Sequence, residues 1–348
     1  MEEKSRFDVG VVAAVGAALG ATAVLGVSRV LDGLLDRNTT LLSRKILAAQ
    51  PCGLPPFCDT NQELLSVMED NALALDERAK RAFAQARQEH VDLTVDSGSL
   101  RLSGKLYVHQ TDGHTTGERT WAVLAHPYRC SSHAMERVAA LYLEHGFNVL
   151  SLDLRAHGES EGSTIGLGWK DGQDILEWVG YLVARFGLDV KIVLHGESLG
   201  AAACMNACFW NSYAQVSAVV CDSCFETFRN LALRVIRKHA VMPAEPLYTA
   251  LRIGALAMRQ IDLNRNRPID AAAFSHVPAL FINGAIDEMV PPFAAAKLYD
   301  ACAAQNKRLH ITPKAGHGAS LLVDPQDYER LLFEFLAEQG LCAQPEEE

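Results

Sequence analysis

The residues best suited to chemistry in this sequence lie in one short stretch, His195-Gly196-Glu197-Ser198-Leu199-Gly200. An apolar run ends just before it and a small-residue helical pattern begins just after it, which indicates a strand, a sharp turn and a helix. Because Gly196 and Gly200 have no Cβ atom, strand and helix can approach closely and hold Ser198 in a strained conformation. This is typical of a nucleophile elbow, whose serine hydroxyl projects beside a helix N-terminus. The alternative is a glycine-rich turn whose serine only caps the helix.

A nucleophilic serine needs a base and an orienting acid, and two later loops supply candidates. Asp287 follows the predicted strand 279–283, and His317 lies on a glycine-flanked loop after the next predicted strand. The order Ser198, Asp287, His317 is that of one known arrangement of a catalytic triad. The carboxyl ends of parallel strands meet at one edge of a sheet, so residues distant in sequence can come together there. A single loop histidine is more often a surface residue, and the prediction therefore rests on all three.

An oxyanion site is predicted at another strand end. The predicted strand 121–125 is followed by His126-Pro127-Tyr128-Arg129. We expect the backbone N–H groups of Tyr128 and Leu199 to stabilise the oxyanion of a tetrahedral intermediate. Pro127 has no N–H group, which leaves Tyr128 as the better donor in this loop.

Other polar residues near these strand ends could have either a catalytic or a structural role. Asp222 ends the strand after the elbow, and it is either a second acid or a turn-forming residue. Glu197 and His195 flank the elbow, and we expect them to pack beneath it rather than to titrate in catalysis. The segment 155–161, which contains Arg155 and His157, is expected to shape a turn at the rim of the sheet.

The elements that must position these residues alternate between strands and helices. A two-strand hairpin is predicted at 91–102. The later predicted strands are 121–125, 148–153, 190–195, 216–221, 279–283 and 308–312, and the helical stretches are 133–145, 169–186, 199–210, 292–303 and 325–339. This pattern predicts the α/β class, with a mainly parallel central sheet flanked by helices.

The chain is expected to divide into three parts. Residues 1–30 form a hydrophobic anchor segment, residues 31–90 a helical collar or linker, and residues 91–340 the α/β domain. Within that domain, residues 223–275 are too long for a connection in a compact sheet, and we interpret them as a helical lid insertion.

The N-terminal region contains an uncharged, apolar run at residues 9–27, long enough to span a bilayer. Gly16 and Gly20 add a G-x-x-x-G spacing that favours helix packing in lipid. We expect an uncleaved, single-pass membrane anchor and hence membrane association. A cleaved signal peptide of a secreted or periplasmic protein, and a soluble helix packed on the body, are the alternatives. Basic residues are more numerous after the run, which favours a cytoplasmic body.

Composition narrows the function classes. The 348 residues carry a net charge of -10 with no basic cluster, which argues against nucleic-acid binding. The nine cysteines are scattered, and we expect most to be buried small hydrophobes. A Cys52–Cys58 disulfide, and a redox or metal-binding role of Cys221-x-x-Cys224, stay open.

Five motifs together resemble a known superfamily. They are HPYRCSS at 126–132, DLRAHGESEG at 153–162, GWKDGQDILEW at 168–178, HGESLGAA at 195–202 and CDSCFETF at 221–228. Over roughly 91–340 the chain resembles the α/β-hydrolase superfamily, and more closely a bacterial group of serine hydrolases with one N-terminal hydrophobic segment. The resemblance implies the α/β-hydrolase fold and esterase-like acyl transfer to water, without a metal or organic cofactor.

The sequence therefore predicts a serine hydrolase that cleaves small carboxylic esters or thioesters through an acyl-enzyme. In this mechanism His317 deprotonates Ser198 and Asp287 orients the imidazole. A peptidase or acyltransferase with the same fold is one alternative. A non-catalytic, membrane-tethered binding protein is the other, although all three triad residues are present. The oligomeric state cannot be read from the sequence.

Overall fold

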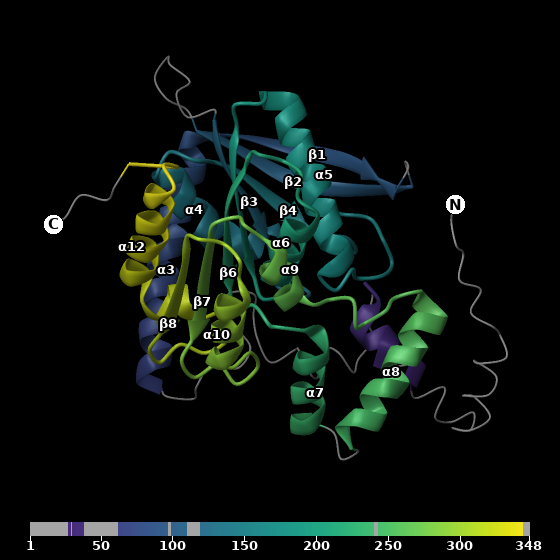
Figure 1. Cartoon of the computed structure of the whole chain (residues 1–348). Helices are drawn as coiled ribbons and strands as arrows, with labels where there is room; N and C mark the ends of the chain where they lie inside the picture. The colour runs from purple at the N-terminus through teal and green to yellow at the C-terminus, as the bar shows by residue number, and fades with distance from the viewer. Residues whose placement is uncertain are drawn as a thin grey trace.

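A computed structural model describes residues 27–37 apart from 29, and residues 62–96, 99–109, 119–239 and 243–343 (Figure 1). At the centre is an eight-stranded sheet with the strand order β1-β2-β4-β3-β5-β6-β7-β8. The strands are β1 Ala86–Val95, β2 Leu100–His109, β3 Thr120–Ala125, β4 Asn148–Asp153, β5 Lys191–Glu197, β6 Val216–Asp222, β7 Ala279–Gly284 and β8 Lys307–Thr312. The pairs β1–β2 and β2–β4 are antiparallel, and the other neighbours are parallel. The predicted mainly parallel sheet is confirmed.

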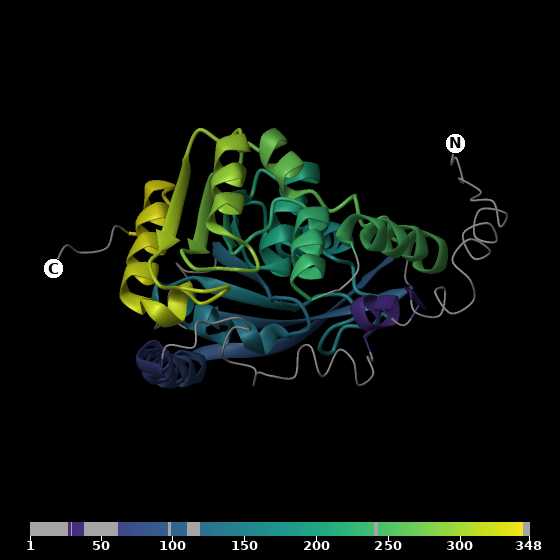
Figure 2. The same ribbon diagram turned by 90° about the horizontal axis from the view of Figure 1, so that it is seen from below.

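Helices cover both faces of the sheet, so strands β3, β4 and β7 are buried along nearly their whole length (Figures 1 and 2). One buried cluster includes residues of the sheet and of α5 Trp169–Phe186, α6 Leu199–Trp210, α9 Pro268–Phe274 and α10 Pro292–Ala301. The other lies between the sheet and α3 Gln62–Gln85, α4 Glu136–Glu144, α11 Ser320–Val323 and α12 Pro325–Glu338. A short 3-10 helix, Ser132–Met135, precedes α4. These two layers hold the strand ends that carry the candidate site.

The hairpin and the insertion differ in detail from the expectation. Strand β1 begins at Ala86 rather than at 91, directly after α3. Between β6 and β7 the chain forms α7 Phe228–His239, α8 Ala244–Arg259 and α9. Helices α7 and α8 pack on each other, whereas α9 packs against α6 and α10. The small buried side chains of α9 pack against α6, so α9 belongs to the helical layer that covers the sheet. The expected insertion 223–275 therefore includes one helix of that layer.

The apolar run at 9–27 lies outside the described residues except for its last residue. No helix in the described part of the chain is long and apolar enough to cross a membrane. Residues 27, 28 and 30–35 are helical. Asp36 then bridges to Thr164 in the loop after β4. We call residues 27–37 the strap. The division at residues 30 and 90 stays a prediction.

Candidate active site

The turn between β5 and α6 has the strained geometry expected of a nucleophile elbow. Ser198 has a φ of 53° and a ψ of -108°, a region that non-glycine residues rarely adopt. A Cβ atom on Gly200 would lie 2.0 Å from the carbonyl oxygen of Ala125, and one on Gly196 would lie 2.2 Å from the backbone of Gly200. Only glycine fits at either position. The backbone N–H of Ser198 donates to the carbonyl of Asp222 at 2.8 Å, which fixes the turn against β6.

Three side chains from three strand ends meet at this elbow. The Nε2 atom of His317 lies 2.8 Å from the Oγ atom of Ser198, and its Nδ1 atom lies 2.8 Å from Oδ2 of Asp287. The other carboxylate oxygen of Asp287 accepts hydrogen bonds from the N–H groups of Met289 at 2.9 Å and Val290 at 2.7 Å. The relative exposures of Ser198, Asp287 and His317 are 7%, 3% and 3%. The arrangement lets an imidazole with its proton on Nδ1 accept the serine proton at Nε2.

The predicted oxyanion donors lie on a tight turn and at a helix start. Cys130 donates its N–H to the carbonyl of Pro127 at 3.2 Å, which closes the turn that carries Tyr128. Leu199 is the first residue of α6, where backbone N–H groups lack helical acceptors. Within the described residues, the N–H groups of Tyr128 and Leu199 make no hydrogen bond.

A chain of buried polar groups lies beneath the elbow. His195 is hydrogen-bonded to the hydroxyl groups of Tyr142 at 3.0 Å and Tyr328 at 3.2 Å, and burial lowers its pKa to about 3. The Tyr328 hydroxyl in turn donates to Asp222 at 3.1 Å. Because His195 stays neutral and fully paired, it is a packed structural residue, as the sequence indicated.

Within the described residues, Asp222 makes no hydrogen bond to the imidazole of His317. One of its oxygens accepts from Tyr328 and the other from the hydroxyl of Ser223 at 2.9 Å. Burial raises the pKa of Asp222 to about 6. The Ser223 hydroxyl also accepts the N–H of Gly318 at 3.0 Å, next to His317. The structure thus pairs His317 with Asp287, while Asp222 and Ser223 tie the histidine loop to β6. Sequence reasoning missed Ser223, because no local pattern distinguishes it from an ordinary turn residue.

The carboxyl group of Glu197 lies under the histidine loop. A Cβ atom on Gly318 would approach its Oε1 atom to 2.4 Å. Burial, followed by repulsion from the Asp222 carboxylate, raises the pKa of Glu197 to about 8. Glu197 therefore binds a proton at neutral pH, which fits the expectation that it packs beneath the elbow.

The segment 155–161 also fits the expectation of a structural role. The Nε of Arg155 donates to buried Asp174 at 2.7 Å. His157 accepts the backbone N–H of Arg129 at 3.2 Å through its Nε2 atom, and burial lowers the pKa of its imidazole to about 3. These contacts shape the rim next to the predicted oxyanion turn.

The seven described cysteines form no disulfide: Cys130, Cys204, Cys208, Cys221, Cys224, Cys302 and Cys342. Five of them are buried, which confirms the reading of most cysteines as small hydrophobes. Burial raises the pKa of the Cys221 thiol well above its usual value. Among the described residues no group of three or more His, Cys, Asp or Glu side chains could hold a metal ion. Cys52 and Cys58 lie outside the described residues.

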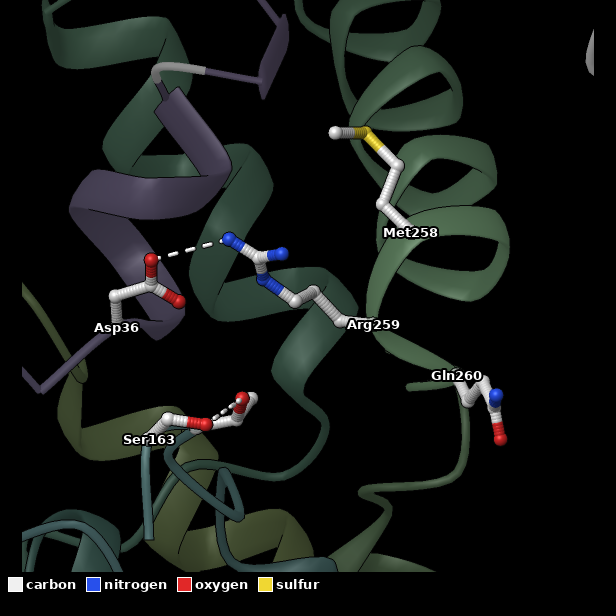
Figure 3. Close-up of a pocket in the computed structure, with 6 residues that line it drawn as sticks. Asp36, Ser163, Met258, Arg259 and Gln260 are labelled. Atoms are coloured by element: carbon white, nitrogen blue, oxygen red, sulfur yellow. Dashed lines mark hydrogen bonds and ion pairs between the residues drawn. The ribbon is translucent and has the colours of Figure 1, made fainter.

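A hollow of about 400 Å³ opens at the strap rather than at the elbow (Figure 3). Its lining consists of Asp36, Ser163, Thr164, Met258, Arg259 and Gln260. None of the three residues that meet at the elbow contributes to it. The hollow instead marks where the strap, the loop after β4 and the end of α8 come together.

A mainly parallel sheet with a strained serine after β5, an acid after β7 and a histidine after β8 defines the class of α/β hydrolases. The chain belongs to the alpha/beta hydrolase family, whose family model matches residues 106–331.

Curated relatives match part of this chain. The "Uncharacterized membrane protein YNL320W" of Saccharomyces cerevisiae is 30% identical over 200 residues, covering 57% of this chain and 64% of that protein. "Protein bem46" of Schizosaccharomyces pombe is 25% identical over 210 residues, covering 60% and 64%. The chain thus matches less than two thirds of the length of these relatives.

Solved structures share the fold. The esterase Pf2001 of Pyrococcus furiosus superimposes with a TM-score of 0.59 at 23% identity, covering 74% of this chain and 93% of that one. The acylaminoacyl peptidase of Pyrococcus horikoshii superimposes with a TM-score of 0.54 at 15% identity, covering 76% and 43%. At these identities the similarity establishes the fold alone.

Proposed function

We propose that the protein is a serine hydrolase that cleaves carboxylic esters, thioesters included, through an acyl-enzyme intermediate. The observation that carries the proposal is the hydrogen-bonded chain from Ser198 through His317 to Asp287, built on a strained elbow. Membership of the alpha/beta hydrolase family supports hydrolase activity as such. A serine activated by a histidine can form an acyl-enzyme from esters, thioesters and amides alike, and the preference for esters and thioesters is part of the proposal.

In the proposed mechanism His317 accepts the hydroxyl proton of Ser198 at Nε2 while the serine oxygen attacks the acyl carbonyl. Asp287 holds the Nδ1–H tautomer and stabilises the imidazolium that forms. Collapse of the tetrahedral intermediate breaks the bond to the alcohol or thiol, which leaves with the proton from Nε2. Water then repeats the sequence on the acyl-enzyme and releases the acid.

The oxyanion of each tetrahedral intermediate would accept hydrogen bonds from the unpaired N–H groups of Tyr128 and Leu199. A preorganised donor of this kind stabilises the transition state by about 3 kcal/mol. The positive end of α6 points at the same place and adds to this stabilisation.

The substrate side of the site would be formed in part by α7 and α8, which we propose act as a lid. Many of their apolar side chains, such as Phe228, Leu233 and Leu251, are buried and hold the insertion on the body. Val235, Ile286 and Phe293 stay substantially exposed on or near this insertion. An apolar acyl group is the substrate portion that such a surface accommodates.

The test is hydrolysis of p-nitrophenyl esters from acetyl to dodecanoyl by the full chain, solubilised in detergent, and by its Ser198→Ala variant. We expect the variant to lose a factor on the order of 10⁴ or more in kcat. Ser217→Ala is the matched control, because Ser217 lies on β6 and bonds only the carbonyl of Gln215. Turnover by Ser198→Ala at the wild-type rate would refute the serine mechanism. Two folded but inactive proteins would redirect the search to amides or to a binding role.

We further propose that residues 9–27 anchor the protein in a membrane. The support is the uncharged run in the sequence and the name of the Saccharomyces cerevisiae relative, which calls that protein a membrane protein. Carbonate extraction of membranes from cells that express the full chain tests this. An anchored chain stays in the pellet, whereas release of a shortened chain into the medium or periplasm would favour a cleaved signal peptide.

A further inference from the structure

The turn that carries Tyr128 is held in a conformation that it would not adopt by itself. Arg129, the next residue, has a φ of 59°, in the left-handed region that disfavours residues with a Cβ atom. A non-glycine residue in this region is strained and persists only where its surroundings hold it. The contacts of Arg129 therefore show what maintains this turn.

One support comes from the rim of the sheet. The N–H group of Arg129 donates to the Nε2 atom of His157, whose Nδ1 atom is bonded to the carbonyl of Arg155. This fixes the backbone of the turn from one side. The guanidinium group of Arg129 makes separate contacts, with Tyr128 and with the strap.

The second support is the strap. The Nη2 atom of Arg129 donates to the carbonyl of Gly33 at 2.6 Å and to that of Asp36 at 3.1 Å. The hydroxyl of Tyr128 donates to the carbonyl of Leu34 at 2.6 Å and accepts from the Nε of Arg129 at 3.0 Å. The carbonyl groups of Gly33 and Leu34 belong to the last turn of a helix, where they lack helical donors and carry partial negative charge, and that of Asp36 follows directly after it. A cation with several N–H groups matches them well.

The strap is itself firmly attached to the body. Leu31 and Leu35 are 1% and 0% exposed and belong to the main buried cluster. The N–H of Ile165 donates to the carbonyl of Leu35 at 2.7 Å. Arg259 at the end of α8 pairs with Asp32 at 2.7 Å and with Asp36 at 3.0 Å, beside the hollow in Figure 3. The strap thus joins the predicted oxyanion turn to a helix of the insertion.

Close packing between the strap and α8 is possible because Gly254 has no side chain. A Cβ atom there would lie 2.8 Å from both Leu31 and Val27. Figures 1 and 2 both place the strap helix alongside α8. An alanine at residue 254 would therefore press on the side chains of Leu31 and Val27 in the strap without touching Arg129.

We propose that Arg129 is a positioning residue for the reaction: by binding the terminal carbonyl groups of the strap helix, it holds the N–H of Tyr128 toward the oxyanion. This rests on the proposed function. The strap, far from the elbow in sequence, is then part of the machinery that shapes the active site. A purely structural reading, in which Arg129 only caps a helix, predicts lost stability with unchanged chemistry per folded molecule.

The experiment compares the full chain with Arg129→Ala, Arg129→Lys and Ser198→Ala. Active sites are counted by labelling with a fluorophosphonate, and kcat, KM and the inhibition constant of a trifluoromethyl ketone are measured per labelled site. We expect Arg129→Ala to lower kcat per site by roughly 10- to 100-fold with little change in KM, a part of the loss seen when an oxyanion donor is removed. The ketone binds as a tetrahedral adduct, so its affinity should fall by the same factor as kcat/KM.

Arg129→Lys keeps the charge but not the forked geometry, and we expect an intermediate loss. Arg330→Ala, which removes a half-exposed arginine of α12, is the control for loss of charge. Gly254→Ala should lower kcat by displacing the strap, whereas Ala257→Ser, a similar change on the exposed side of α8, should not. If Arg129→Ala does not fold, Tyr128→Phe, which removes only the bond to Leu34 and to the Arg129 Nε, gives the same readout.

The outcomes separate the two proposals. If Ser198→Ala retains activity, the proposed function fails. If Ser198→Ala is inactive while the Arg129 variants match the wild type per labelled site, the positioning role is overturned and the serine mechanism stands. A fall in melting temperature and labelled fraction, with unchanged kcat per site, also overturns it.

Discussion

Replacement of Asp287 by Asn is the most direct test of the proposed roles of Asp287 as the orienting acid and His317 as the base. In the native site two backbone N–H groups, those of Met289 and Val290, donate to one carboxylate oxygen, and the other oxygen faces Nδ1 of His317. An asparagine would place its single oxygen at the two N–H groups, because the reversed orientation loses both hydrogen bonds at about 1 kcal/mol each. Its NH₂ group then faces His317.

An NH₂ group donates to Nδ1 and therefore places the imidazole proton on Nε2, opposite Ser198. In this tautomer Nε2 cannot accept the serine proton. We expect Asp287→Asn to lower kcat by about 10⁴, which corresponds to about 5.5 kcal/mol in the barrier, with KM nearly unchanged. The rate of p-nitrophenyl ester hydrolysis, normalised to folded protein, measures this.

Asp222→Asn is the matched control, because Asp222 is equally buried at a neighbouring strand end but bonds Ser223 and Tyr328 instead of His317. We expect it to retain far more activity than Asp287→Asn. If Asp287→Asn keeps more than a tenth of the wild-type kcat, the tautomer reasoning is wrong. If Asp222→Asn is the more damaged of the two, the acid has been assigned to the wrong carboxylate.

Three further changes have definite expected results. Gly200→Ala places a Cβ atom 2.0 Å from a backbone oxygen, so we expect a melting temperature lower by many degrees or no soluble protein; a wild-type thermal transition would contradict this. Because the pKa of Glu197 is raised to about 8, the contribution of this residue to stability is complete below about pH 4.5 and is lost as pH rises through 8. Glu197→Gln should therefore flatten the fall in melting temperature between pH 6 and 9. Parallel curves for the wild type and the variant would refute this. Ser223→Ala removes the acceptor of the Gly318 N–H and should lower kcat about fivefold, whereas an unchanged kcat would show that the histidine loop holds itself in place.

Much of the architecture could be predicted because it depends on local patterns. Continuous apolar runs bounded by turn residues predicted the parallel strands, since a strand covered on both faces has no polar side. The elbow was also local: Gly196 and Gly200 are needed within five residues of each other, on either side of Ser198. The chain order of serine, acid and histidine then indicated which strand ends should meet. The structure brings these three side chains together, and their catalytic roles stay a prediction.

The contacts that could not be predicted from the sequence are those between residues that are far apart in the chain. From the sequence, α9 was assigned to the insertion, because small residues do not indicate which helix they pack against. The role of Ser223 depends on a loop 95 positions away in the sequence. In the same way, Asp222 and Asp287 look equivalent as acids at strand ends, and only their hydrogen-bond partners separate them.

The sequence by itself determined the parallel sheet, the elbow and the candidates for base and acid, because each depends on backbone sterics and burial over a few residues. Only the tertiary structure decided that the N-terminal strap docks on the turn carrying Tyr128 and Arg129. The physical reason is that the strap contributes main-chain carbonyl groups, which every residue has. No residue type in residues 27–37 marks them as acceptors, so their role depends entirely on where the folded chain places them.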